Sequence, residues 1–273
     1  SISHYFPSTS WLQFPPCYNR QKAFPERAMV LFFDPKQCLP SAAELPDSDD
    51  TPVDNELQNL IPNLLDTILA MVWPHRLDWF FGVDMGIYSH PKEPPLVPDG
   101  FLSLGVERFI GEEGRLSYVL WEEENIVPTL ALEVVSKTYG GEYDIKMERY
   151  ADLGIRYYAV YLPNPRFRRS RSPLEVYELV DGVYQQLTGN PIWLPEVGLS
   201  LGRERGTYLG RDREWLYWYD QAGNRLLTPE EQTEQERMRA EQERMRAEQE
   251  RMRAEQERSR AEQEQARAEQ EHI

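Results

Sequence analysis

The sequence predicts a mixed α/β (α+β) fold, in which a β-sheet core is flanked by helices and followed by a long charged C-terminal helix. Three observations support this class. Residues 54–73 place apolar side chains at helical spacing, several short apolar runs surround a second amphipathic helix, and a seven-residue repeat begins near residue 230. Strands joined by a crossover helix are typical of a sheet with helices packed on it.

The first helix is predicted from "DNELQNLIPNLLDTILAMVW", where apolar residues recur at i, i+3, i+4 and i+7. Asp54 is a candidate N-cap, because its side chain can accept a hydrogen bond from the first helical turn. Pro62 lacks a backbone donor, so it predicts a kink or a restart of the helix.

The predicted strands before the second helix are "LDWFFGVDMGIYS", "LVPDGFLSLG", "LSYVLW" and "TLALEVVS". The second helix begins near Gly141 and is expected to end at Gly154. The run "IRYYAVYLP" that follows has apolar side chains on both of its alternating faces, which predicts a central strand buried on both sides. "LEVYELVDGVYQQL" predicts a hairpin, with Asp181 and Gly182 at the turn.

We divide the chain into residues 1–43, a Pro- and aromatic-rich extension with a candidate strand at 28–33; a body at 44–228; and a heptad-repeat helix at 229–273. In the repeat "EQERMRA", Glu234 and Arg237 are spaced for an ion pair within one helix. If Met238 occupies position d of a heptad, Gln242 occupies position a, and such a seam is weak beside Leu and Ile. A solvated single helix and a coiled coil both remain open.

The composition excludes several classes of protein. A net charge of −16 is the opposite of what general coating of nucleic acid requires. Two cysteines and four scattered histidines favour neither a disulfide framework nor a zinc site. Motifs for phosphate-binding loops, dinucleotide folds, zinc proteases and serine hydrolases are missing. Without a signal peptide or an apolar run that could span a bilayer, a cytoplasmic location and no membrane partner are expected.

Glu133 stands inside an apolar run, where removing a carboxylate from water is costly. Asp99 begins another predicted strand, and if the two strands are neighbours, both acids converge at one sheet edge. Carboxylate oxygens without histidine suit a hard cation such as Mg²⁺. The alternative is that Glu133 is a strand-end acid that accepts backbone or arginine hydrogen bonds.

Two sets of basic residues are candidates for contact with an anionic substrate. Lys146 could orient a metal-bound water or stabilise developing charge, or it could form an ordinary surface ion pair with Glu142. The loop "PRFRRSRSP" could bind phosphates, or it could be a solvated turn. Its arginines are Arg166, Arg168, Arg169 and Arg171.

The order and spacing of "VPDGFLSLG", "LALEVVS" and "DIKMERYADLGIRYYAVYLP" resemble the Uma family of endonucleases, which share the restriction-endonuclease-like fold of the PD-(D/E)XK superfamily. The resemblance covers roughly residues 44–228. It implies that Asp99 and Glu133 bind Mg²⁺ or Mn²⁺, with Asp84 as a further ligand, and that Lys146 is the catalytic lysine. Lys137 competes for that last role.

The resemblance implies a divalent-metal-dependent endonuclease that hydrolyses phosphodiester bonds of nucleic acid, with DNA favoured over RNA. The chain departs from the wider fold at Val135, where a lysine is usual. The alternative is therefore a catalytically inactive module that associates through its C-terminal helix. A homo-oligomer, formed through the body or through that helix, is left open.

Overall fold

The computed structural model describes residues 39–45, 56–135, 141–167 and 171–271. The chain divides into two compact units, residues 1–225 and residues 226–273. The candidate strand at 28–33 and the candidate cap Asp54 lie outside the described residues. Among those that are described, no helix combines the length and the apolarity needed to cross a bilayer.

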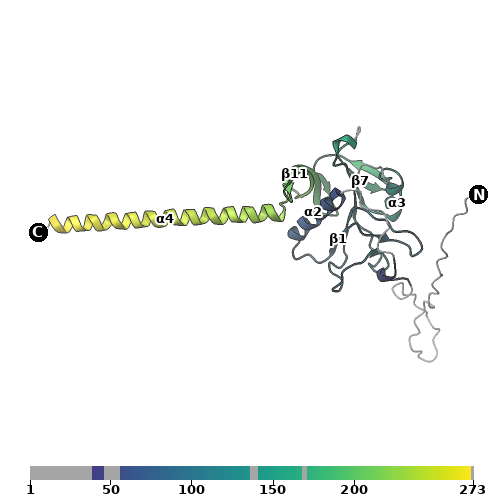
Figure 1. The fold of residues 1–273 in the computed structure, drawn as a ribbon, viewed down its shortest axis with the longest axis horizontal. Helices are drawn as coiled ribbons and strands as arrows, with labels where there is room; N and C mark the ends of the chain where they lie inside the picture. The colour runs from purple at the N-terminus through teal and green to yellow at the C-terminus, as the bar shows by residue number, and fades with distance from the viewer. Residues whose placement is uncertain (1–38, 46–55, 136–140, 168–170, 272–273) are drawn as a thin grey trace, which may run out of the picture. The chain divides into compact units, whose positions relative to one another are not determined.

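A six-stranded mixed sheet forms the centre of the first unit (Figure 1). The pair β5–β6 is parallel and every other neighbouring pair is antiparallel. Every residue of β5 and β6 is buried, which confirms the prediction of a central strand covered on both faces. In spatial order the strands are β1 (Trp79–Val83), β3 (Gly100–Leu104), β5 (Leu130–Val134), β6 (Tyr157–Tyr161), β7 (Leu174–Val180) and β8 (Val183–Leu187).

The hairpin β7–β8 has the predicted two-residue turn. Asp181 and Gly182 have φ angles of 50° and 77°. Two consecutive positive φ values match the right-handed twist of the flanking strands, and Asp-Gly tolerates them best. The local sequence therefore determines the register of this hairpin.

The helix α2 (Glu56–Val72) covers one face of the sheet with its apolar side. It continues through Pro62, so the predicted restart does not occur. A Cβ added at Gly100 would lie 2.9 Å from Pro62 Cβ, which shows how closely the helix approaches β3. The indole nitrogen of Trp218 donates to the carbonyl oxygen of Leu65 at 3.1 Å and joins α2 to strand β11.

Strand β11 belongs to a second, three-stranded antiparallel sheet that the sequence pattern did not predict. A parallel pair of two-residue strands completes the strand inventory of the described residues. The second sheet contains β9 (Ile192–Leu194), β10 (Leu199–Tyr208) and β11 (Arg211–Tyr219), and the small pair is β2 (Ile87–Tyr88) with β4 (Tyr118–Val119).

Part of the expected N-terminal extension packs against the body. Residues 39–45 include the short 3₁₀ helix η1 (Ala42–Glu44). Leu39, Ala42 and Leu45 pack against the buried side chains of β2 and β4. The indole nitrogen of Trp121 donates to the carbonyl oxygen of Pro40 at 2.9 Å, so this segment is joined to the body by packing and by a buried hydrogen bond.

The helix α3 (Ile145–Leu153) covers the face of the sheet opposite α2. The Asp144 side chain accepts from the backbone nitrogen of Ile145 at 2.6 Å, and Gly154 ends the helix with a φ of 87°. Side chains alternate along a strand, so Phe101 points away from the face on which Gly100 meets α2. Phe101 and the fully buried Tyr150 of α3 belong to one apolar cluster.

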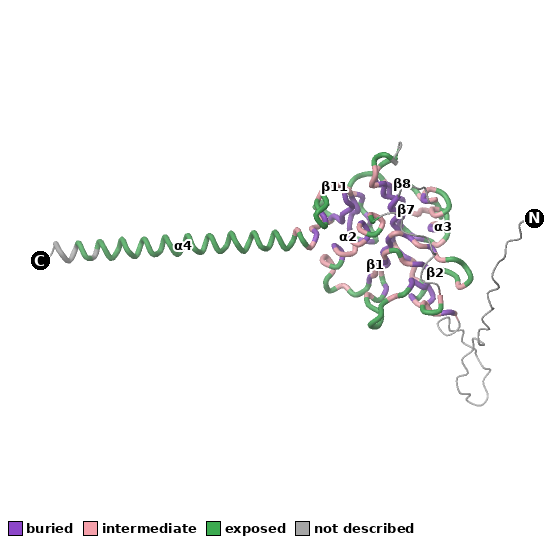
Figure 2. Tube along the Cα trace, viewed as in Figure 1, coloured by how far each residue is buried: buried purple, intermediate pink, exposed green. Residues whose placement is uncertain are grey.

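The second unit is the helix α4 (Pro229–Glu271). Thr228 and Glu231 form a reciprocal cap: the Glu231 amide donates to Thr228 Oγ1 at 3.2 Å, and the Thr228 amide donates to Glu231 Oε2 at 2.9 Å. From Glu234 onwards every described side chain of the helix is exposed (Figure 2). The predicted fold class is thus confirmed, including the long charged helix.

Candidate active site

Three acidic residues occupy corresponding positions on neighbouring strands. The register pairs Val83 with Gly100 and Gly100 with Leu132, so the next residues across the sheet are Asp84, Asp99 and Glu133. The strands that bear Asp99 and Glu133 are neighbours, as convergence of the two acids requires. Asp84 has a φ of 49° and donates its backbone N–H to the carbonyl oxygen of Asp99 at 3.2 Å.

Glu133 is 2% exposed, and both of its carboxylate oxygens accept hydrogen bonds from α3. Lys146 Nζ donates to Oε2 at 2.8 Å, and the Tyr150 hydroxyl donates to Oε1 at 2.6 Å. Burial raises the pKa of Glu133, while Lys146 and Tyr150 oppose that rise. A charge-assisted pair and a second donor thus offset much of the cost of desolvating this carboxylate.

Asp99 lies beside Glu133 and has one strong donor of its own. Its Oδ2 accepts the backbone N–H of Val134 at 2.6 Å. Burial, and then the negative charge of Glu133, raise the pKa of Asp99 to about 8. Ionising Asp99 is therefore costly in a buried site that already holds Glu133, and a further cation would lower this cost.

Lys146 remains charged at neutral pH. Burial lowers the pKa of its ammonium group, but the charge and the hydrogen bond of Glu133 raise it more, and Asp99 adds to the rise. The net shift is upward. Lys146 can therefore act as a fixed positive charge or as a hydrogen-bond donor, and it is poorly suited to accept a proton.

Tyr150 is a site residue that the sequence pattern did not predict. Lys146 and Tyr150 are one helical turn apart, so their side chains lie on the same side of α3. Both reach Glu133 from that side. The i, i+4 spacing of a lysine and a tyrosine after a strand with a buried acid was the available signal.

A further buried acid lies on the same line across the sheet. The register pairs Glu133 with Val160 and Val160 with Glu175. Glu175 Oε2 accepts from the Tyr177 hydroxyl at 2.9 Å and from Arg171 Nη1 at 3.3 Å. The end of the basic loop is in this way attached to β7, two strands away from Glu133.

The other predicted basic residues are only partly described. The Arg171 guanidinium lies 3.5 Å from the ring centroid of Tyr143. Arg166 is exposed in the 3₁₀ helix η2 (Pro165–Phe167). Arg168, Arg169 and the competing lysine Lys137 lie outside the described residues.

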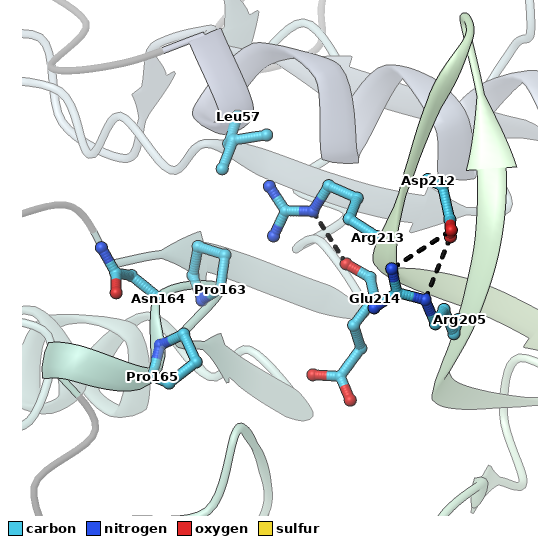
Figure 3. A pocket seen from close by; sticks show the side chains of 8 residues that line it. All are labelled: Leu57, Pro163, Asn164, Pro165, Arg205, Asp212, Arg213 and Glu214. Carbon is cyan, nitrogen blue, oxygen red and sulfur yellow. Dashed lines mark hydrogen bonds and ion pairs between the residues drawn. The ribbon is translucent and has the colours of Figure 1, made fainter.

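A cavity of about 520 Å³ opens beside the loop that follows β6 (Figure 3). Because β5 and β6 are parallel, this loop and the end of the strand that carries Glu133 are at the same edge of the sheet. Arg213 lines the cavity and donates through Nε to the carbonyl oxygen of Glu214 at 3.0 Å. The residues that line it are Leu57, Pro163, Asn164, Pro165, Arg205, Asp212, Arg213 and Glu214.

The described residues contain no group of three or more His, Cys, Asp or Glu side chains arranged to hold a metal ion. Glu56, the first residue of α2, forms an ion pair with Arg211 of β11. The strand register aligns Asp99 with Glu133 and places Asp84 on the adjoining strand.

A mixed sheet with helices on both faces and acids at the ends of its central strands is the arrangement that the resemblance to restriction-endonuclease-like proteins predicts. Residues 50–205, more than half of the chain, match the family model Uma2, described as "Putative restriction endonuclease". The chain belongs to the Uma2 family. Among curated proteins, no sequence matches it.

Proposed function

We propose that this protein is a divalent-metal-dependent endonuclease that hydrolyses phosphodiester bonds of nucleic acid, with DNA as the favoured substrate. The observation that supports the proposal is the meeting of Asp99, Glu133 and Lys146 at one sheet edge. Family membership points to the same reaction class. The acids and the ammonium group come from three separate elements, so their convergence is not an accident of local sequence.

The oxygen donors of Asp99 and Glu133 are of the chemical type that a hard cation such as Mg²⁺ or Mn²⁺ prefers. Asp99 and Glu133 would hold the ion, with Asp84 as a further ligand, because carboxylate oxygens are its preferred donors. Burial, and then the negative charge of neighbouring carboxylates, raise the pKa values of Asp99 and Glu133, so a bound cation would stabilise the charged form of both acids. When bound, the ion would polarise the scissile phosphate and lower the pKa of a bound water.

The chain's own residues would position the charges around the phosphate. Tyr150 fixes one oxygen of Glu133, and the Val134 amide fixes one oxygen of Asp99. Lys146 would orient the attacking water or stabilise the extra negative charge that forms at phosphorus. Its raised pKa keeps the ammonium group protonated for that role.

Basic residues at the same edge would bind the nucleic-acid backbone. Arg166, Arg168, Arg169 and Arg171 belong to the loop after β6, and Arg213 lines the neighbouring cavity. Arg171 is already held by Glu175, so it would orient the loop as well as contribute charge. The net charge of −16 confines phosphate contact to such a local set.

The proposal is tested by incubating the purified chain with plasmid DNA and with RNA, in Mg²⁺ or Mn²⁺ and in chelator. Cleavage in metal alone is expected, and Asp99→Asn, Glu133→Gln and Lys146→Met should each abolish it. Asp152→Asn, an exposed change on the same helix as Lys146, is the matched control and should retain activity. Full activity in a folded Lys146→Met protein would exclude the proposed role of that lysine.

The second candidate function is a catalytically inactive binding module. Val135 replaces the usual lysine, and both Glu133 oxygens already accept hydrogen bonds from α3, which favours this alternative. It predicts that the protein binds nucleic acid equally well with metal and with chelator, and cleaves none of it. Electrophoretic mobility shift with labelled DNA distinguishes this outcome from the first.

A further inference from the structure

The helix α4 presents a regular stripe of exposed apolar side chains. Met238, Met245 and Met252 recur every seven residues and are 53%, 50% and 53% exposed. A straight α-helix has 3.6 residues per turn, so a seven-residue stripe drifts about 20° around it per heptad. Only a left-handed supercoil around another helix keeps such a stripe on one line.

The remaining positions of the heptad follow from the methionines. With methionine at d, glutamine occupies a, arginine occupies e and glutamate occupies g in each repeat that contains methionine. The e arginines make no ion pair with another described residue of the chain, so they are available to a partner. These arginines are Arg239, Arg246 and Arg253.

The charges at positions e and g indicate which helix can pair with α4 and whether the pair is parallel or antiparallel. In a parallel pair, the g residue of one helix faces the e residue of the next heptad of its partner. When the two helices are in register, Glu241 therefore faces Arg246, and the same pairing of glutamate with arginine recurs in the neighbouring heptads. In an antiparallel pair, e faces e and g faces g, so arginine would oppose arginine and glutamate would oppose glutamate. A second copy of this helix is therefore complementary in one orientation only.

We propose that α4 forms a parallel, in-register, two-stranded coiled coil with α4 of a second copy of this chain. The methionines supply the apolar contact, and the glutamines at a pair across the seam. Polar residues at a reduce stability but fix the register, because a shifted pair would leave their hydrogen bonds unmade. The many glutamates and arginines on the outer positions keep the rod hydrated.

The association has a direct consequence for the bodies. In each chain the body precedes α4, so a parallel pair brings both bodies to the N-terminal end of the rod. Two copies of the candidate active site would then be present in one assembly. This inference rests on the helix alone and holds whether or not the body cleaves nucleic acid.

Disulfide trapping of the full chain tests the orientation. In a background that carries Cys17→Ser and Cys38→Ser, a cysteine is introduced at d as Met238→Cys or Met252→Cys. These sites are about 21 Å apart along the helix. In an antiparallel pair, at most one of the two positions can therefore face the same position of the partner helix. The matched controls are Ala240→Cys and Ala254→Cys, which occupy the outer f position of the same heptads.

Mild oxidation should crosslink both d variants about tenfold faster than the f variants, because a disulfide needs Cβ atoms about 4 Å apart. Equal rates at d and f, or crosslinking at only one d site, would overturn the proposal. Since each d and f pair differs by two residues on one exposed helix, a difference in folding of the body cannot produce this pattern.

Sedimentation equilibrium of the full chain provides the second measurement. The parent protein should have the mass of a dimer, and replacing Arg239, Arg246 and Arg253 by glutamate should give a monomer. Mixing that variant with one in which Glu234, Glu241 and Glu248 are replaced by arginine should restore a dimer of mixed composition. A parent monomer, or a dimer that survives the charge reversal unchanged, contradicts the proposal.

Discussion

The substitution Lys146→Met tests the electrostatic account of the candidate site. It keeps a long aliphatic side chain on α3 but removes the ammonium group that donates to Glu133 at 2.8 Å. Glu133 would then keep Tyr150 as its donor at 2.6 Å. An almost fully buried carboxylate would lose its opposite charge, and the fold would lose stability.

The magnitude follows from how far the pair is exposed. Removing one partner of a fully buried ion pair costs about 3–5 kcal/mol, whereas an exposed pair is worth at most about 1 kcal/mol. The side chain of Glu133 is 2% exposed and that of Lys146 is 31% exposed, so water screens one end of this pair. We therefore expect Lys146→Met to lower the free energy of unfolding by about 2 kcal/mol at pH 7.

Urea denaturation of a double-mutant cycle measures this value. In a Glu133→Gln background the carboxylate charge is gone, so Lys146→Met should cost less than about 0.5 kcal/mol. The cost should also shrink as the pH falls towards the ordinary glutamate pKa of 4.5, because Glu133 becomes neutral in both states. An equal cost of Lys146→Met in both backgrounds would refute the reasoning.

Three further predictions concern the same body. Tyr150→Phe should destabilise the protein by about 2 kcal/mol in urea denaturation, because one oxygen of the buried Glu133 loses its donor. Glu123→Gln should cost about 3 kcal/mol in the same assay, because it neutralises an ion pair with Arg115 in which the side chains are 6% and 3% exposed. The raised pKa of Asp99, about 8, means that the folded state holds a proton which the unfolded state releases above the ordinary value of 3.8. The free energy of unfolding should therefore fall as pH rises from 4 to 8 and then level off, and Asp99→Asn should reduce that slope in metal-free buffer, leaving the contribution of Glu133, whose pKa is also raised.

Local patterns determined much of the fold because they are set by residues close together in the chain. The apolar spacing that predicts α2, the Asp181-Gly182 turn and the seven-residue repeat of α4 each arise within one or two helical turns or across one hairpin. A glutamate inside an apolar strand also indicated a candidate functional residue, because burying a carboxylate is costly. Glu133 is indeed buried.

Long-range pairing decided the rest. The sheet β9–β10–β11 has alternating, charge-rich strands, and α2 packs against it through the bond from Trp218 to Leu65, residues far apart in the chain. Charged side chains such as Arg205 and Asp212 form ion pairs across the hairpin. Because this pairing depends on strand register, the sequence alone did not predict that these charged runs are strands.

The sequence by itself determined which residue types could form the site: two strand-borne acids and a lysine on the following helix. The tertiary structure alone decided that Lys146 pairs with Glu133, that Tyr150 joins them, and that Glu175 holds Arg171 on a neighbouring strand. The physical reason is that the identity of an acid is a property of the chain, whereas its partner depends on strand register and on which face of the sheet a helix covers.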